Sequence, residues 1–271
     1  MHLKTMYIAM LLGAAFTAMM TLIFYFTDLD LVITASFYAG SNQFPVGGTM
    51  PWAFFNEKDD IVLYIMVGII LFLFIIGLCN KYFRPFLVYG LFMLVSYLVG
   101  PGLIVNVLLK GNDDLGFYIG WSRPRPDQLS IFGGPIPRFY RIWEPAFLDG
   151  YQLTNSSFPS GHVTVGAMFI VIFLAFNNVD FIARIFGEKT RTKIVIINAI
   201  KYAGLVAAIV LSIIFSISRI SAGRHFASDC MYAVFFTWLP AVVLYYWVFK
   251  IPRLEQRALD RMKTVATNQP K

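Results

Sequence analysis

Six long apolar stretches dominate this sequence and restrict its possible folds more than any other feature. The first, 6–26, contains 21 residues without a charged side chain. A helix needs about 20 mostly apolar residues to cross the roughly 30 Å hydrocarbon core of a bilayer. Five further stretches are also mainly apolar, with Lys201 and Asp229 as the charged residues inside them: 61–79, 86–109, 160–176, 194–217 and 226–249. We therefore expect an all-α, polytopic membrane protein built as a bundle of six transmembrane helices.

The composition supports a membrane protein and excludes a soluble core of this size. Hydrophobic residues make up 58% of the 271 residues and charged residues only 14%, whereas soluble domains carry about 25% charged residues. The net charge is +7, but the basic residues mostly flank apolar stretches, which indicates membrane orientation and not nucleic-acid binding. Two cysteines are too few for a disulfide framework or a cysteine-based metal site. A single membrane-embedded domain over 1–271 is expected, with a motif core at 110–229.

Basic and acidic connections alternate from one side of the predicted bundle to the other. Cytoplasmic connections carry an excess of Lys and Arg, and with six spans the basic connections fall on one side: Lys4, Lys81 with Arg84, 177–201 and the tail 250–271. Both termini are therefore expected in the cytoplasm, and the end of the basic tail is expected to be disordered. The acidic segment 27–60, which either lies at the membrane interface or forms an ordinary aromatic-rich loop, falls on the opposite side. The long loop 111–158 lies there too.

Four residues that can bind anions or move protons stand at span ends on this outer side. Lys110 ends the third span, and His162 starts the fourth. Arg219 ends the fifth span, and His225 starts the sixth. Charged side chains at bilayer depth are costly and usually mark a functional site. The alternating direction of the spans therefore predicts that these four residues meet at one non-cytoplasmic surface.

The segment 158–162, Phe-Pro-Ser-Gly-His, opens the fourth stretch. Proline followed by serine predicts a helix start with Ser160 near the N-cap. The unpaired N–H groups and the macrodipole of such an end favour an anion. Gly161 allows a ligand to approach the backbone, and His162 can transfer a proton near neutral pH. The segment therefore predicts an oxyanion cradle beside an acid/base.

A second group of polar residues surrounds the start of the last stretch. His225 and Asp229 are four residues apart, so on a helix they would share a face and hydrogen-bond, which leaves one imidazole nitrogen free to attack. Cationic side chains offer guanidinium forks and a point charge to phosphate oxygens: Arg219, Arg123, Arg125 and Lys110. This set indicates phosphoryl transfer to a histidine, with cations in the place that a metal ion occupies elsewhere.

One pair of adjacent carboxylates in the long loop, Asp113 and Asp114, could suggest a metal site. No third ligand stands at a suitable spacing, so solvated carboxylates are the favoured interpretation. We expect no metal and no cofactor.

Together these motifs resemble the three signatures of the phosphatidic acid phosphatase type 2 superfamily. The second and third signatures match fully, as segment 158–162 and as Ser218-Arg219-x5-His225-x3-Asp229. The resemblance implies that His225 is the nucleophile, that Asp229 orients it, and that His162 protonates the leaving oxygen. It also implies a set of phosphate-holding residues: Lys110, an arginine of the first motif, Ser160, Gly161 and Arg219.

The first signature departs from the family pattern, because Arg123 and Arg125 both lie further from Lys110 than is usual. The context Ser-Arg-Pro-Arg-Pro, followed by Phe132-Gly133-Gly134, resembles bacterial members related to lipid A phosphatases. That alignment makes Arg125 the motif arginine, whereas the shorter spacing favours Arg123.

The resemblance implies a metal-independent lipid phosphatase in a bacterial inner membrane, with a phosphohistidine intermediate and a site that faces the periplasm. Its substrate would be a phosphorylated membrane lipid: lipid A, phosphatidylglycerol phosphate, phosphatidic acid or undecaprenyl pyrophosphate. The Phe132-Gly133-Gly134 context favours lipid A. Two alternatives would use the same residues, namely a lipid-to-lipid phosphotransferase and a non-catalytic phospholipid transporter.

Overall fold

The computed structural model describes residues 3–111, 120–153 and 156–267, so Asp113 and Asp114 lie outside the described residues. Within these ranges the chain is helical, and its β structure is limited to one isolated bridge between Leu129 and Ile136. The predicted all-α polytopic architecture is confirmed. Five helices of the described chain are long and apolar enough to cross a membrane, and a bent helix pair makes a sixth candidate.

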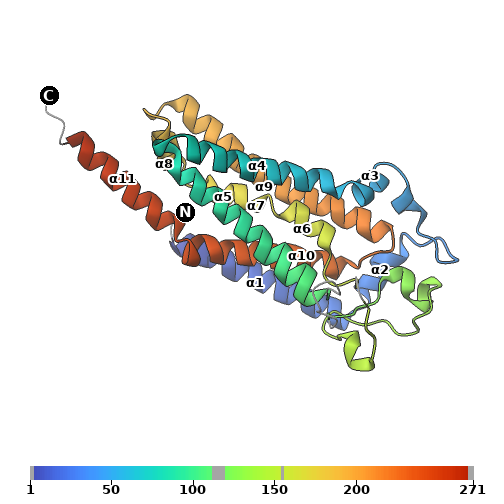
Figure 1. Ribbon diagram of the computed structural model, residues 1–271. Helices are drawn as coiled ribbons and strands as arrows, with labels where there is room; N and C mark the ends of the chain where they lie inside the picture. The colour runs from blue at the N-terminus through green and yellow to red at the C-terminus, as the bar shows by residue number, and fades with distance from the viewer. Residues whose placement is uncertain (1–2, 112–119, 154–155, 268–271) are drawn as a thin grey trace.

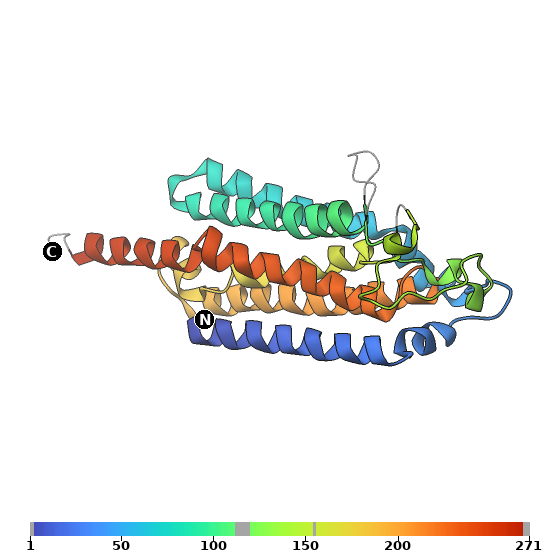
Figure 2. The same ribbon diagram turned by 90° about the horizontal axis from the view of Figure 1, so that it is seen from below.

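The spanning helices lie side by side in a bundle (Figures 1 and 2). They are α1 (Leu3–Phe26), α4 (Asp59–Cys79), α5 (Arg84–Tyr97) continued by η3 (Leu98–Leu109), α9 (Arg191–Ser221), and α10 (Ala227–Val243) continued by η7 (Leu244–Val248). The extension η3 is π-helical and contains Pro101. Proline removes a backbone hydrogen bond, which accounts for the irregular helix at this point.

The fourth span is short and broken. It consists of α6 (Gly161–Ala167) and α7 (Ile170–Ala175), and α8 (Val179–Ile185) follows at an angle of 72°. Small residues let this span pack closely against α9. A Cβ at Gly166 would come within 2.8 Å of the Leu211 backbone, and one at Gly204 within 2.7 Å of Ile172. Close helix approach through glycine is common in membrane bundles, and here it places α6 at the centre of the molecule.

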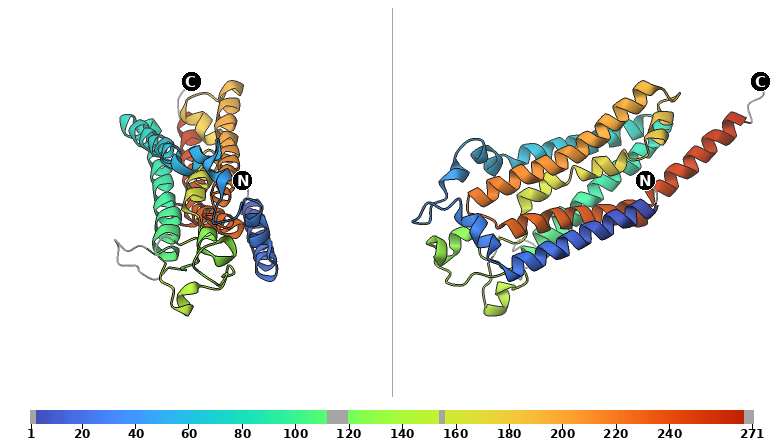
Figure 3. Two further views of the ribbon diagram at one scale, coloured as in Figure 1. Left: turned by 90° about the vertical axis from the view of Figure 1, so that its right-hand side faces the viewer. Right: turned by 180° about the vertical axis from the view of Figure 1, so that it is seen from behind.

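Short helices and loops cover one end of the bundle (Figure 3). They are α2 (Leu29–Ala35), η1 (Pro45–Gly48), α3 (Trp52–Glu57), η4 (Pro126–Gln128), η5 (Ser130–Phe132) and η6 (Ala146–Asp149). Part of the aromatic 27–60 segment packs onto protein: Phe55 meets Phe215 of α9 edge-on, and Phe44 packs against Phe132. The turn between α9 and α10 bends at Gly223, whose φ is +65°, and a Cβ there would collide with Phe44.

The opposite end carries the start of α1 and the C-terminal helix α11 (Ile251–Thr267) (Figure 1). The basic tail is helical as far as Thr267, and its end, residues 268–271, for which disorder is expected, lies outside the described residues. α11 is anchored at its base: Ile251 is buried, and the Tyr89 hydroxyl donates to Glu255 Oε1 at 2.6 Å. Burial raises the pKa of Glu255 to about 7.

Candidate active site

The predicted anion-binding and proton-transferring residues gather at the covered end of the bundle. Lys110 follows η3, His162 lies in α6, Arg219 lies in the last turn of α9, and His225 lies just before α10. Lys110 reaches the start of α6, because a Cβ at Gly161 would lie 3.8 Å from Lys110 Nζ. The alternating spans therefore place these residues at one end of the bundle, as the sequence predicts.

Three cations surround the imidazole of His225. The ring is fully buried, and burial lowers its pKa well below the ordinary value, with further lowering by the charges of Lys110, Arg219 and Arg125. The same crowding acts on Lys110, whose pKa falls to about 8 through burial and the charges of Arg125 and Arg219. His225 is therefore neutral near pH 7, which is the protonation state that a nucleophilic imidazole requires.

A backbone carbonyl sets the tautomer of His225. Its Nδ1 lies 2.6 Å from the Ser157 carbonyl oxygen, and because a carbonyl only accepts, Nδ1 carries the proton and donates. The other nitrogen, Nε2, is buried without a hydrogen-bonding partner among the described residues. The ring therefore presents an unpaired lone pair inside a positively charged environment.

The direct hydrogen bond predicted between His225 and Asp229 is absent. Asp229 Oδ2 lies 4.0 Å from His225 Nδ1 and accepts instead from Ser157 Oγ at 2.5 Å and from the Phe226 N–H at 2.8 Å. The i,i+4 argument fails because α10 begins at Ala227, and its N-cap, Phe226, has extended backbone angles. Ser157 therefore stands between the carboxylate and the imidazole, and no sequence motif marks it.

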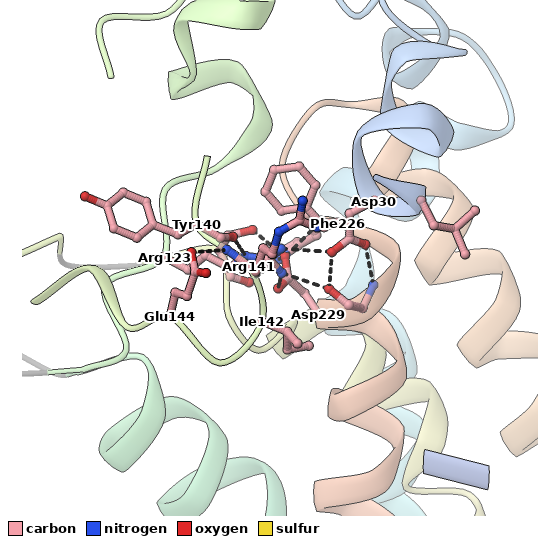
Figure 4. A network of polar contacts seen from close by, with 12 residues as sticks. Asp30, Arg123, Tyr140, Arg141, Ile142, Glu144, Phe226 and Asp229 are labelled. Atoms are coloured by element: carbon pink, nitrogen blue, oxygen red, sulfur yellow. Dashed lines mark hydrogen bonds and ion pairs between the residues drawn. The ribbon is translucent and has the colours of Figure 1, made fainter. Parts of the chain in front are cut away.

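Arg123 lies in a buried ion-pair core (Figure 4). Its guanidinium is fully buried and pairs with Asp229 at 2.6 Å and with Asp30 at 2.9 Å. It also donates to Ser228 Oγ and to the Tyr140 carbonyl and stacks over Phe226 at 4.4 Å. Burial alone would lower the pKa of Arg123, but the charges of Asp229 and Asp30 outweigh it and raise the pKa.

Arg125 lies in a different environment, although only Pro124 separates it from Arg123. Its side chain is partly exposed, and its Nε is buried without a partner among the described residues. Burial and the charge of Arg224 lower its pKa. Of the two candidate motif arginines, Arg123 has its guanidinium committed to carboxylates, and Arg125 has donor capacity left for a ligand.

Several buried polar atoms near His225 have no hydrogen-bonding partner among the described residues. Ser160 is the N-cap residue of α6, as predicted, but its hydroxyl makes no capping hydrogen bond. The unpaired atoms of the predicted site residues are Ser160 Oγ, Arg125 Nε, Arg219 Nε and His225 Nε2. Buried polar groups are almost always paired, so such a concentration marks a site for a polar ligand.

Residues from the N-terminal half complete the site, and sequence reasoning missed them. Asn56 Oδ1 accepts from Arg219 Nη1 at 3.3 Å, and Asp59 Oδ2 lies 3.6 Å from His162 Nε2. Asp30 joins the Arg123 core across 93 residues of sequence. The only available signal was the cluster of five acidic residues in the 27–60 segment. Its spacing resembles no motif.

Among the residues with described placement, no three His, Cys, Asp or Glu side chains form a group that could hold a metal ion. Arg224, which flanks the site, pairs with Asp127 at 3.1 Å. Burial raises the pKa of Asp127, and the charges of Arg224 and Arg125 oppose that rise. Arg224 and Asp127 therefore offset each other's charge, and the positive charges next to His225 are those of Lys110, Arg219 and Arg125.

Comparison with known proteins gives consistent results. The chain is 27% identical over 228 residues to a lipid A 4'-phosphatase of Francisella tularensis subsp. novicida, covering 83% of this chain and 88% of that protein. It is 30% identical over 151 residues to lipid A 4'-phosphatases of Rhizobium leguminosarum and Rhizobium etli, covering 55% of this chain but only 49% and 44% of those proteins. No solved structure matches the chain.

A family model described as the PAP2 superfamily matches residues 85–253. These residues include the third to sixth spans and every motif residue that the fold brings to the covered end. With well over half of its length matched, including the whole cationic site around His225, this chain belongs to the PAP2 superfamily.

Proposed function

We propose that this protein is an integral membrane phosphatase that removes phosphate from a lipid headgroup through a phosphohistidine intermediate. The observation that carries the proposal is the set of unpaired buried atoms around His225, in which three come from anion-binding side chains and one is a nucleophilic nitrogen. A tetrahedral phosphate satisfies all four, because its oxygens accept from Ser160, Arg125 and Arg219 while its phosphorus faces Nε2 of His225.

The proposed reaction has two steps. In the first, His225 Nε2 attacks phosphorus, the bond from phosphorus to the headgroup oxygen breaks, and His162 protonates the departing oxygen. In the second, water attacks the phosphorus of the phosphohistidine, the bond from phosphorus to His225 Nε2 breaks, His162 accepts the proton of that water, and inorganic phosphate leaves. Lys110, Arg125 and Arg219 stabilise the charge on the equatorial oxygens in both steps, so the chemistry is proposed to proceed without a metal.

The Ser157 carbonyl contacts His225 directly, whereas the Arg123 core acts on His225 indirectly. As His225 becomes phosphorylated, its ring gains positive charge, and Asp229 lies close enough to stabilise that charge. Asp229 is held by Ser157, by the Phe226 N–H and by Arg123. In this proposal Asp229 orients the nucleophile through Ser157, and Arg123 orients Asp229. Arg125 then takes the phosphate-binding role of the first motif, with Gly161 allowing the phosphate to approach the α6 backbone.

We propose lipid A as the substrate, on the basis of the curated relatives and of the Phe132-Gly133-Gly134 context. Phosphatidylglycerol phosphate, phosphatidic acid and undecaprenyl pyrophosphate are the other candidates. The positive-inside distribution of Lys and Arg supports a bacterial inner membrane location with cytoplasmic termini and a site that faces the periplasm. The substrate would then enter from the outer leaflet with its acyl or prenyl chains still in lipid.

Phosphate release by the purified protein in detergent tests the function. The four candidate lipids are supplied separately, with EDTA present and with no lipid acceptor. We expect release of inorganic phosphate, fastest from lipid A and undiminished by the chelator. Release only after an acceptor lipid is added would identify a phosphotransferase, and binding without any release would identify a transporter. Loss of activity in EDTA that added metal restores would contradict the metal-independent mechanism.

The pKa of Lys110 predicts how phosphate binding depends on pH. Since this pKa is about 8 in the free protein, Lys110 loses its charge as the pH rises above 8, and an anion then binds less tightly. We expect the competitive inhibition constant of inorganic phosphate to rise between pH 8 and pH 9.5 by up to about tenfold per unit. Lys110→Arg keeps its charge over this range, so its inhibition constant should stay flat. An equal rise in the arginine variant would exclude Lys110 as the cause.

A further inference from the structure

His162, the proton donor of the proposed reaction, lies near positive charges that oppose its protonation. To donate, His162 must carry a positive charge, yet Arg219, Lys110 and Arg125 all act on it as nearby positive charges. Like charges disfavour the charged form of a group. A carboxylate beside His162 would offset this repulsion, as the aspartate does for the imidazolium in serine hydrolases.

Asp59 is placed to supply that charge. It is the first residue of α4, separated from the end of α3 by Lys58, and its Oδ2 lies 3.6 Å from His162 Nε2. Among the residues that the structure describes, it is the one carboxylate within ion-pairing distance of His162. Both side chains are partly buried, with exposed fractions of 31% for Asp59 and 26% for His162, so water screens the pair only in part.

The backbone of α3 also helps to hold the imidazole of His162 in place. Asn56, three residues before Asp59, contributes a backbone hydrogen bond to His162, while its side chain accepts from Arg219. The α3–α4 connection therefore contacts both the proton donor and one of the phosphate-binding cations. This connection precedes the part of the chain that the PAP2 family model matches, 85–253.

We propose that Asp59 is a positioning residue for His162: it orients the imidazole and stabilises the protonated form that gives its proton to the leaving oxygen. Asp59 itself stays ionised, and the proton moves only from His162 to the leaving oxygen. The inference rests on the proposed phosphatase function. It adds to that function a residue from the N-terminal half of the chain.

The dependence on leaving group tests this role. An alkyl phosphate and a nitrophenyl phosphate of matched chain length are compared in detergent micelles through kcat/KM, which reports the phosphorylation step. An alkoxide needs a proton to leave, whereas a nitrophenolate leaves without one. We expect Asp59→Asn to lower kcat/KM about 10- to 100-fold for the alkyl phosphate and less than about threefold for the nitrophenyl phosphate. Asp59→Glu, which keeps the charge, should recover part of the alkyl activity.

The chain offers a matched control in Asp60, the next residue, which is exposed. Asp60→Asn should match the unaltered protein on both substrates. Equal losses on the two substrates in Asp59→Asn, or no loss on either, would overturn the inference, since a structural or binding role does not depend on the leaving group. If His162→Ala and His225→Ala also retain turnover, the proposed function itself fails. If these two lose turnover while Asp59→Asn does not, only the role of Asp59 fails.

Discussion

The His225→Ala variant is expected to lose at least about 10⁴-fold in kcat while remaining folded. Alanine removes Nε2, the unpaired nitrogen surrounded by Lys110, Arg125 and Arg219, and the remaining cations can bind phosphate but cannot form the covalent intermediate. Binding should survive. We therefore expect kcat to fall far more than the inhibition constant of inorganic phosphate changes. A transporter that uses the same pocket would instead keep its function in this variant.

Trapping the intermediate sharpens this test. In His162→Ala, a nitrophenyl phosphate should still phosphorylate His225, because its leaving group needs no proton, but the second step loses its general base. Labelled phosphate should therefore accumulate on the His162→Ala protein in an acid-labile, base-stable form typical of phosphohistidine. The double variant that also carries His225→Ala should remain unlabelled. Label on the double variant would place the nucleophile elsewhere.

The loss of the imidazole must be separated from unfolding. His225 contributes one buried hydrogen bond to the Ser157 carbonyl, and such a bond contributes about 0.5–1.5 kcal/mol. The thermal midpoint in detergent should therefore fall by only a few degrees. If the midpoint stays within that range while kcat falls at least about 10⁴-fold, the loss of activity is a loss of the chemical step and not of the fold.

Most of the site could be predicted because two simple constraints act on it. Mainly apolar stretches of about 20 residues locate the spans, and the alternation of spans then determines which motif residues share an end. Lys110, His162, Arg219 and His225 meet for this reason alone. The fourth span departs from a single straight helix. The 160–176 stretch is barely long enough to cross a bilayer, and its helix divides after Ala167.

What could not be predicted depends on contacts between distant segments or on backbone geometry at helix ends. Asp30 and Asp59 reach the site from a segment whose pattern resembles no motif, and only the folded chain brings them to Arg123 and His162. The contact of His225 with Asp229 was derived from helical spacing, but His225 precedes the helix. The choice between Arg123 and Arg125 was open because sequence spacing says nothing about which side chain is surrounded by carboxylates.

The largest effect on stability is expected from Arg123. Its guanidinium is fully buried between Asp30 and Asp229, and removing one partner of a buried ion pair costs about 3–5 kcal/mol because the remaining charge is left uncompensated. Arg123→Ala leaves the carboxylates of Asp30 and Asp229 without a positively charged partner. Arg123→Lys cannot reproduce the planar guanidinium that contacts both of them. We expect both variants to lower the thermal midpoint in detergent by on the order of 10 °C or more, with loss of activity following from loss of structure.

Arg125→Lys is the matched control, because it makes the same substitution two residues away. Arg125 forms no ion pair with a carboxylate among the described side chains, so its midpoint should change by no more than about 2 °C. Its effect should fall on phosphate binding and raise KM. If Arg123→Lys raised KM while its midpoint stayed unchanged, Arg123 would be the phosphate ligand, and the assignment of the two arginines would have to be exchanged.

A double variant distinguishes the two possible causes of this destabilisation, namely an uncompensated buried charge and the loss of packing contacts. Asp30→Asn removes one of the two carboxylates that Arg123 neutralises, so in the Arg123→Gln background it should be less destabilising than in the native background. Contacting residues in one ion-pair network couple by about 0.5–3 kcal/mol, and a coupling of this sign and size would show that uncompensated charge causes the loss. Strict additivity would instead assign it to the contacts of the guanidinium with Phe226, Tyr140 and Ser228. Both outcomes are changes in stability, which is the property that we expect Arg123 to control.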